Sequence, residues 1–172
     1  MGGTHYVNIG YDMCMLHVHL ITVGSIKETY LNLGIRDFEQ RIKPFINLTF
    51  HEVDETVIQG DQPTLIEQAL TKDAEKIMRF LPKQTYFVVM DIAGKMMDSP
   101  TLAAKLDQLQ SISGNLTILI GGSHGIDASL KAKAKEKWSF SPLTFPHQLF
   151  RLMVLEQLYR AMTILHHHPY HK

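Results

Sequence analysis

Five short apolar segments alternate with longer segments of helical character, and this alternation restricts the fold more than any other feature of the chain. The apolar segments are rich in aliphatic and β-branched residues, which favour strands. They cover residues 16–23, 47–53, 85–90, 116–120 and 138–140. Strict alternation of strand and helix predicts an α/β fold, with a mainly parallel sheet and helices on both of its faces.

Each expected helix has its own start signal. Two have a capping box, in which a hydroxyl and a carboxylate three residues apart bond each other's backbone N–H groups. A third has an N-cap serine before a proline, a fourth follows an aspartate that can cap it, and the last begins at a proline. In chain order, these signals are Ser25 with Glu28, Thr64 with Glu67, Ser99 with Pro100, Asp127, and Pro146.

Length and composition limit the class of protein. The chain has 172 residues, enough for one domain with its own core, and 45% of them are hydrophobic. No stretch approaches the roughly 20 apolar residues of a membrane span, and a single cysteine, Cys14, excludes an internal disulfide. We therefore expect one cytoplasmic domain over residues 15–172, without a membrane partner, and a loose N-terminal extension over residues 1–14.

The net charge is zero, but it is unevenly distributed. Residues 131–172 hold seven Lys or Arg and two Glu, a net charge of +5, so residues 1–130 carry −5. A basic C-terminal segment suits contact with phosphate groups. A solvated helix face is the alternative explanation for the four lysines between residues 131 and 137.

The last expected helix predicts a second subunit. Between residues 149 and 165, apolar side chains point in almost every helical direction, whereas a helix that lies on a sheet needs only one apolar stripe. We expect a homodimer in which the partner covers the outer side of this helix. The alternative is that the chain wraps the helix itself.

Two irregular segments near the C-terminus form a candidate ligand pocket. Residues 121–125, Gly-Gly-Ser-His-Gly, follow the fourth expected strand, and glycines let the backbone approach a ligand closely. Residues 140–145, Phe-Ser-Pro-Leu-Thr-Phe, have no helix or strand period and offer backbone groups to an uncharged ring such as adenine. The glycine segment is neither a phosphate loop nor a dinucleotide fingerprint. Each alone is also compatible with a tight turn or a buried loop.

The polar residues near the C-terminus leave the chemistry open. The adjacent histidines 166–168 point in different directions and have no carboxylate or cysteine at ligand spacing, so we expect no metal site. Glu156 and Arg160 lie one helical turn apart, which fits either a simple ion pair or a pair within a site.

Several motifs stand in a fixed order between residues 16 and 172. They are residues 89–95 (Val-Met-Asp-Ile-Ala-Gly-Lys), 120–125, 140–147, Arg151, 156–160 (Glu-Gln-Leu-Tyr-Arg) and 168–172 (His-Pro-Tyr-His-Lys). This set resembles the ribosomal RNA large subunit methyltransferase H family, bacterial members of the SPOUT or α/β-knot superfamily. The resemblance implies a C-terminal trefoil knot, an obligate homodimer, and S-adenosyl-methionine as methyl donor.

The resemblance also implies a donor site, an acceptor and a set of site residues. The acceptor is N3 of a pseudouridine in 23S rRNA, methylated within the assembled 70S ribosome. The implied donor site maps onto Met90, Gly121, Phe140, Ser141, Pro142, Leu143, Thr144 and Phe145. Because the acceptor nitrogen must lose a proton, the catalytic candidates, left unranked, are His147, Glu156, Arg160 and Tyr170. The expected RNA contacts are Arg151, Arg160, Tyr170, His171 and Lys172.

Two hypotheses extend this interpretation. A short basic tail beside a dimer seam can reach the neighbouring subunit, so the site can be composed from both subunits. Zero net charge predicts weak binding of naked RNA and therefore recognition of the whole ribosome. The alternatives are a tRNA acceptor, a non-catalytic ribosome-binding factor, and a flavodoxin-like nucleotide-binding domain.

Overall fold

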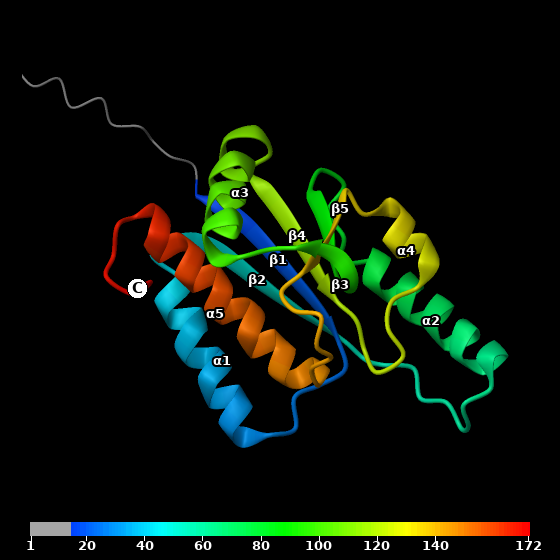
Figure 1. Cartoon of the computed structure of the whole chain (residues 1–172). Coiled ribbons are helices and arrows are strands. Elements are labelled where there is room, and N and C mark those ends of the chain that lie inside the picture. Colours follow the sequence, from blue (N-terminus) through cyan, green and yellow to red (C-terminus); the bar gives the residue numbers. More distant parts are fainter. Residues whose placement is uncertain (1–14) are drawn as a thin grey trace, which may run out of the picture.

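The computed structural model describes residues 15–172, and the expected extension over residues 1–14 lies outside them (Figure 1). Strands and helices alternate along the chain, as predicted. The strands are β1 (Leu16–Val23), β2 (Ile46–Val53), β3 (Tyr86–Met96), β4 (Asn115–Ile120) and β5 (Glu136–Ser139). The helices are α1 (Thr29–Ile42), α2 (Pro63–Met78), α3 (Ser99–Ile112), α4 (Ala128–Lys133) and α5 (His147–Leu165).

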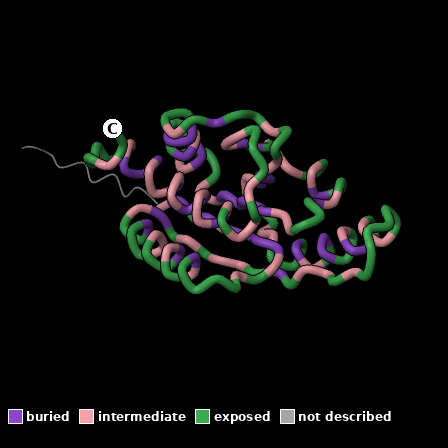
Figure 2. Tube along the Cα trace, turned by 60° about the horizontal axis from the view of Figure 1, so that its bottom comes forward, coloured by how far each residue is buried: buried purple, intermediate pink, exposed green. Residues whose placement is uncertain are grey.

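The five strands form one sheet in the order β2-β1-β4-β3-β5, and every pairing is parallel. Helices α1, α3 and α5 pack on one face, where the larger core cluster lies. Helices α2 and α4 pack on the other face over a smaller cluster. Figure 2 shows the buried residues between these layers. The predicted sheet, with helices on both faces, is confirmed.

Two of the predicted helix starts are wrong. α1 has Glu28 as its N-cap, without a side-chain hydrogen bond, because residues 25–28 lie outside the helix. In this segment Lys27 N–H donates to Gln148 of α5 at 3.2 Å. α2 begins at Pro63, one residue before Thr64. A proline suits the first helical position because its φ is already helical and it lacks the N–H that would stay unpaired.

The remaining starts agree with the sequence to within one residue. Asp98, rather than Ser99, caps α3, and its carboxylate accepts from Thr101 N–H at 2.7 Å. Asp127 caps α4 as predicted, accepting from Ser129 N–H at 2.8 Å. Pro146 directly precedes α5, also as predicted.

Strand β3 is longer than expected and changes register where it leaves the core. Both Met90 and Lys95 pair with Trp138 of β5, so residues 91–94 bulge out between them. Gly94 lies at the crossing of the two strands, and a Cβ there would be 2.7 Å from the Lys137 carbonyl oxygen. The bulge brings Asp91 to the carboxyl end of the regular part of β3.

α5 is fully buried only along one of its sides. Val154, Leu155 and Leu158 lie in the core, whereas Leu149 is 37% exposed and Met153 is half-buried. The outer side of α5 is therefore not wrapped by the described part of the chain. Among residues 15–172, neither this helix nor any other is both long and apolar enough to cross a membrane.

Candidate active site

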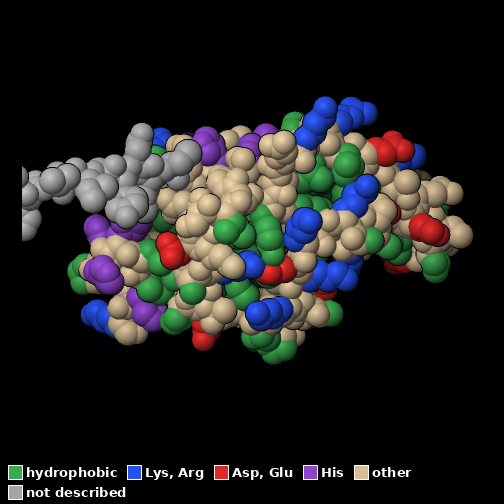
Figure 3. All heavy atoms as spheres, turned by 90° about the horizontal axis from the view of Figure 1, so that it is seen from above, with side chains coloured by type: hydrophobic (Ala, Val, Ile, Leu, Met, Phe, Trp, Pro, Cys, Tyr) green, Lys and Arg blue, Asp and Glu red, His purple; other side chains and the backbone are tan. Residues whose placement is uncertain are grey.

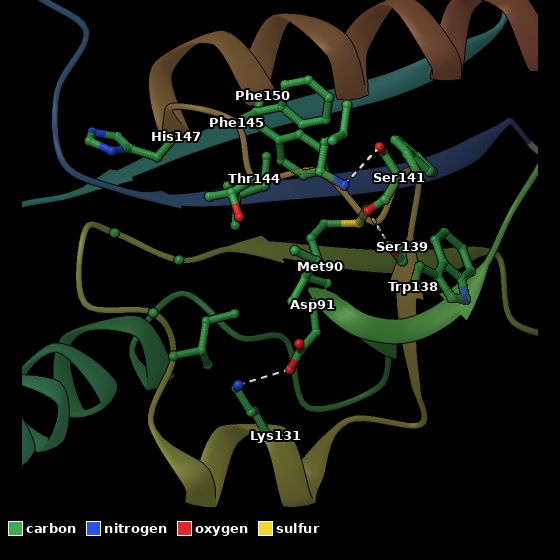
Figure 4. A pocket seen from close by; sticks show the side chains of 18 residues that line it. Met90, Asp91, Lys131, Trp138, Ser139, Ser141, Thr144, Phe145, His147 and Phe150 are labelled. Atoms are coloured by element: carbon green, nitrogen blue, oxygen red, sulfur yellow. Dashed lines mark hydrogen bonds and ion pairs between the residues drawn. The ribbon is translucent and has the colours of Figure 1, made fainter.

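A cavity of about 310 Å³ opens at the carboxyl ends of β3, β4 and β5. Most of its lining comes from the end of β3, the glycine turn after β4, and the segment that joins β5 to α5 (Figure 4). Lys131 of α4 and two residues of α5, His147 and Phe150, complete it. Ligands of parallel α/β sheets bind at this edge. The two segments expected to form a pocket thus meet here. Every residue of the implied donor site lines the cavity except Pro142.

The glycine turn is too crowded for side chains at its first two positions. A Cβ on Gly121 would lie 2.6 Å from the carbonyl oxygen of Gly125, and one on Gly122 would lie 2.5 Å from the Glu55 carboxylate. Gly125 has φ +93°, a conformation that glycine adopts without strain. The turn therefore presents bare backbone to the cavity.

Glu55 fixes the outer side of this turn from the loop that follows β2. Its carboxylate accepts from Ser123 N–H at 2.7 Å and also from the Ser123 hydroxyl. Sequence reasoning missed this residue because its partner lies 68 residues away and no local pattern links them.

Local contacts hold the segment over residues 140–145 in its irregular shape. Ser139 donates its hydroxyl to the Ser141 carbonyl at 3.0 Å, and Leu143 N–H donates to the Ser141 hydroxyl at 3.0 Å. Phe140 and Phe145 both pack on Phe150 of α5, with ring centroids 6.0 and 6.2 Å apart. One wall of the cavity is therefore aromatic, while Leu143 stays exposed.

Trp138 forms another part of the wall and is held by a polar network. Its indole N–H donates to Glu136 at 2.5 Å, and Lys105 and Tyr86 contact the other carboxylate oxygen at 2.6 and 2.7 Å. Burial alone would raise the pKa of Glu136, but the hydrogen bonds from Lys105, Trp138 and Tyr86 outweigh it and lower the pKa to about 2. Glu136 is therefore ionised at neutral pH and orients the indole ring.

One ion pair lines the cavity. Lys131 of α4 contacts Asp91 at 2.8 Å, and Ala93 N–H donates to the second carboxylate oxygen at 3.0 Å. The hydrogen bond from Lys131, followed by that from Ala93, lowers the pKa of Asp91. The sequence places Asp91 directly after a buried strand, a signal for a site residue, but nothing distinguishes Lys131 from its neighbouring lysines.

The structure divides the four catalytic candidates into two groups. His147 lines the cavity. Glu156, Arg160 and Tyr170 form a cluster elsewhere: Arg160 Nε donates to Glu156 at 2.9 Å, and the Tyr170 hydroxyl donates to the same oxygen at 3.1 Å. The nine residues from His147 to Glu156 span about 14 Å of helix. The four side chains therefore do not come together within the described residues.

The Arg160 guanidinium also lies over the Tyr170 ring, with 4.6 Å between Arg160 Cζ and the ring centroid. Burial, and then the Glu156 charge and hydrogen bond, raise the pKa of Tyr170. The phenol thus stays protonated at neutral pH. Its arrangement suits a hydrogen-bond donor rather than a base.

A second cavity, of about 620 Å³, lies beside this cluster on the outer side of α5. Its lining residues are Phe38, Met96, Met97, Asp98, Ser99, Phe140, Leu149, Leu152, Met153, Glu156 and Gln157. Phe140 lines both cavities. One ring of the aromatic wall of the first cavity therefore also lines the second.

Arg151, expected to contact RNA, is instead a buried anchor. Its side chain is 0% exposed, pairs with Glu52 at 2.9 Å, and donates to the carbonyl oxygens of Val23 (2.9 Å) and Gly24. No surface of the guanidinium is available to phosphate, so the RNA-contact prediction for Arg151 is corrected. The spacing of Arg151 along α5 did not reveal that it faces the end of β1.

The other expected RNA contacts lie at the surface or near it. His171 and Lys172 are exposed, whereas Arg160 and Tyr170 are half-buried in their cluster. In the view from above, Lys and Arg side chains gather mainly over the half of the molecule that holds α4 and β5 (Figure 3).

Within residues 15–172, no three His, Cys, Asp or Glu side chains converge to hold a metal ion.

Comparison with known proteins identifies the class to which this fold and cavity belong. A family model described as a predicted SPOUT methyltransferase matches residues 16–171, so the chain belongs to the SPOUT methyltransferases. Proteins named ribosomal RNA large subunit methyltransferase H are similar along their whole length. Those of Desulforamulus reducens, Halothermothrix orenii and Acetivibrio thermocellus are 40, 39 and 41% identical, over 92, 91 and 91% of this chain and 100% of each relative. Within the class, the chain belongs to their family.

Two solved structures share the fold at low sequence identity. One is described as a probable methylase family protein from Haemophilus influenzae, 12% identical, with a TM-score of 0.55 over 92% of this chain and 72% of that chain. The other is described as a probable methyltransferase from Bordetella pertussis, 11% identical, with a TM-score of 0.50 over 87% of this chain and 96% of that chain. The likeness supports the fold alone.

Proposed function

We propose that the chain is an S-adenosyl-methionine-dependent methyltransferase that methylates N3 of a pseudouridine in 23S rRNA of the assembled 70S ribosome. The observation that carries the proposal is the cavity in which the glycine turn and residues 140–145 meet. Membership of the methyltransferase H family supports the ribosomal RNA acceptor. Such an enzyme would act in the cytoplasm, on its ribosomal substrate.

The cavity fits an adenosyl group. A volume of about 310 Å³ and walls of Trp138, Phe140 and Phe145 suit a flat ring, while the bare backbone at Gly121 can approach it closely. The bound donor would supply an activated methyl group for in-line transfer, which needs nucleophile and methyl carbon held about 3–3.5 Å apart. The trefoil knot implied by the family is part of this proposal and stays a prediction.

A homodimer with composite sites is the second element of the proposal. Met96, Leu143 and Leu149 are 53, 67 and 37% exposed on the outer side of α5 and near it, an apolar surface that a second copy would cover. Glu156 and Arg160 lie too far along α5 to serve the cavity of their own subunit together with His147, and Tyr170 packs beside them. In a dimer, this cluster would face the partner's cavity and supply the proton acceptor and the RNA contacts.

Two measurements test the donor and the acceptor. Calorimetry with S-adenosyl-homocysteine should show binding to the wild type and none to Gly121→Ala, whose new Cβ would lie 2.6 Å from the Gly125 carbonyl oxygen. Ribosomes from a strain that lacks the gene should then accept one methyl group at a 23S rRNA pseudouridine. Methyl transfer to tRNA instead would move the enzyme to another substrate. A chain that binds no donor at all would be a ribosome-binding factor.

Mixed dimers test the composite site. Gly121→Ala subunits, which lack the donor site, should be combined with subunits that lack residues 168–172. If each site uses both copies, the mixture regains activity that neither variant has alone. Mixtures that stay inactive would mean that each subunit holds a self-contained site.

A further inference from the structure

The charges in the donor cavity are few and lie on one side. Of the 18 lining residues, only Asp91, Lys131 and His147 have titratable side chains. Figure 4 shows Asp91 and Lys131 on the side of α4, opposite the rings of Phe145 and Phe150, with His147 apart from both at the start of α5. The cavity therefore has an aromatic side and an ionic side.

The ion pair on the ionic side is held in place but keeps capacity for a ligand. Asp91 is 12% exposed and is fixed by both Lys131 and Ala93 N–H. The Lys131 side chain is 34% exposed. Within residues 15–172, its ammonium group forms an ion pair with Asp91 alone. An ammonium has three donors, so two remain for a group inside the cavity.

The methyl donor carries charge on its sulfonium sulfur and at its amino-acid end. Its adenine and ribose are neutral, whereas its amino-acid end carries a carboxylate and an ammonium. A fixed Lys–Asp pair offers the complementary charges in a partly desolvated place, where charge-assisted hydrogen bonds are strong. The aromatic side, by contrast, offers no charged partner to a carboxylate and suits adenine.

We infer that Asp91 and Lys131 bind the amino-acid end of the methyl donor. Lys131 Nζ donates to the carboxylate of the methyl donor, and Asp91 faces the ammonium group of the methyl donor. The inference rests on the proposed function. It makes the pair a specificity determinant, because adenosine compounds without an amino acid would lack these contacts. It also orients the donor, with adenine toward Phe140 and Phe145 and the amino acid toward α4.

The test compares two ligands on matched variants by calorimetry. S-adenosyl-homocysteine carries the amino acid, and 5′-methylthioadenosine has the same adenine, ribose and thioether sulfur without it. Lys131→Met should weaken S-adenosyl-homocysteine about ten- to hundredfold, the value of a lost charge-assisted hydrogen bond, and leave methylthioadenosine within about twofold. Lys133→Met is the control, because Lys133 is exposed on the same helix and does not line the cavity. Lys131→Arg should restore part of the affinity.

Three results would overturn the inference. Equal loss for both ligands would mean that the pair acts on the ribose or on the shape of the cavity. Unchanged affinity for S-adenosyl-homocysteine in Lys131→Met would remove Lys131 from the site. If His147→Gln selectively loses affinity for S-adenosyl-homocysteine while Lys131→Met keeps it, the donor's carboxylate is bound by His147 instead. A wild type that binds neither ligand would reject the proposed function itself. If Lys131→Met melts well below the wild type, Lys131→Gln replaces it.

Discussion

Replacing Arg151 with methionine should destabilise the protein strongly, although Arg151 lies outside the cavity. The guanidinium is fully buried and is the hydrogen-bond donor to the carbonyl oxygens of Val23 and Gly24. Methionine fills much of the same space but leaves both oxygens without that donor. A buried acceptor left unpaired costs about 1–3 kcal/mol. The ion pair with Glu52 adds little, because the Glu52 side chain is 50% exposed.

The expected loss in the free energy of unfolding is therefore about 3 kcal/mol. Urea denaturation, followed by circular dichroism at one fixed protein concentration, measures it. In a domain of this size the melting temperature should fall by about 6–12 °C. Arg36→Met is the matched control, since Arg36 is exposed on α1 and should change stability by less than about 0.5 kcal/mol. If Arg151→Met lies within about 0.5 kcal/mol of this control, Arg151 does not anchor α5 to the end of β1.

Three further predictions concern the site and its substrate. Glu55→Ala should lower the affinity for S-adenosyl-homocysteine about fivefold in calorimetry, because a solvent-exposed charge-assisted hydrogen bond to the glycine turn is lost. The control Glu67→Ala, at an exposed position, should leave this affinity unchanged. Equal affinities of the two variants would refute the role of Glu55. The folded-state pKa of Glu136, about 2, lies below its ordinary 4.5, so its stabilisation is complete above about pH 4.5 and is lost as the pH falls toward 2. Allowing for solvent access, Glu136→Gln should remove about 2 kcal/mol of this acid dependence in urea melts, and an unchanged pH profile would contradict it. Methyl transfer to intact 70S ribosomes should far exceed transfer to isolated 23S rRNA in a tritium assay, since the net charge is zero; equal rates would remove this inference.

The sequence predicts the layers of the fold and the two segments of the pocket, but not the individual side-chain contacts between distant residues. The strand and helix alternation, the Asp127 cap and the meeting of Gly121 with residues 140–145 follow from local patterns that the structure repeats. The capping box at Ser25 is absent because residues 25–28 lie outside the helix, where Lys27 N–H makes a tertiary hydrogen bond to Gln148.

Burial of a charge is the second kind of information that the sequence lacks. Arg151 and Arg160 lie on the same helix, yet one is an internal anchor and the other belongs to a surface cluster. Only the position of α5 over the end of β1 separates them. For the same reason, nothing in the run of lysines from 131 to 137 singles out Lys131, which the fold turns toward Asp91.

A crystal structure with S-adenosyl-homocysteine tests the central claim most directly. We predict the adenosyl group between the backbone of Gly121 and Leu143, with its ring against the aromatic wall. Clear density for the ligand at another place, or an empty cavity in crystals of a chain that binds the ligand in solution, would contradict the account.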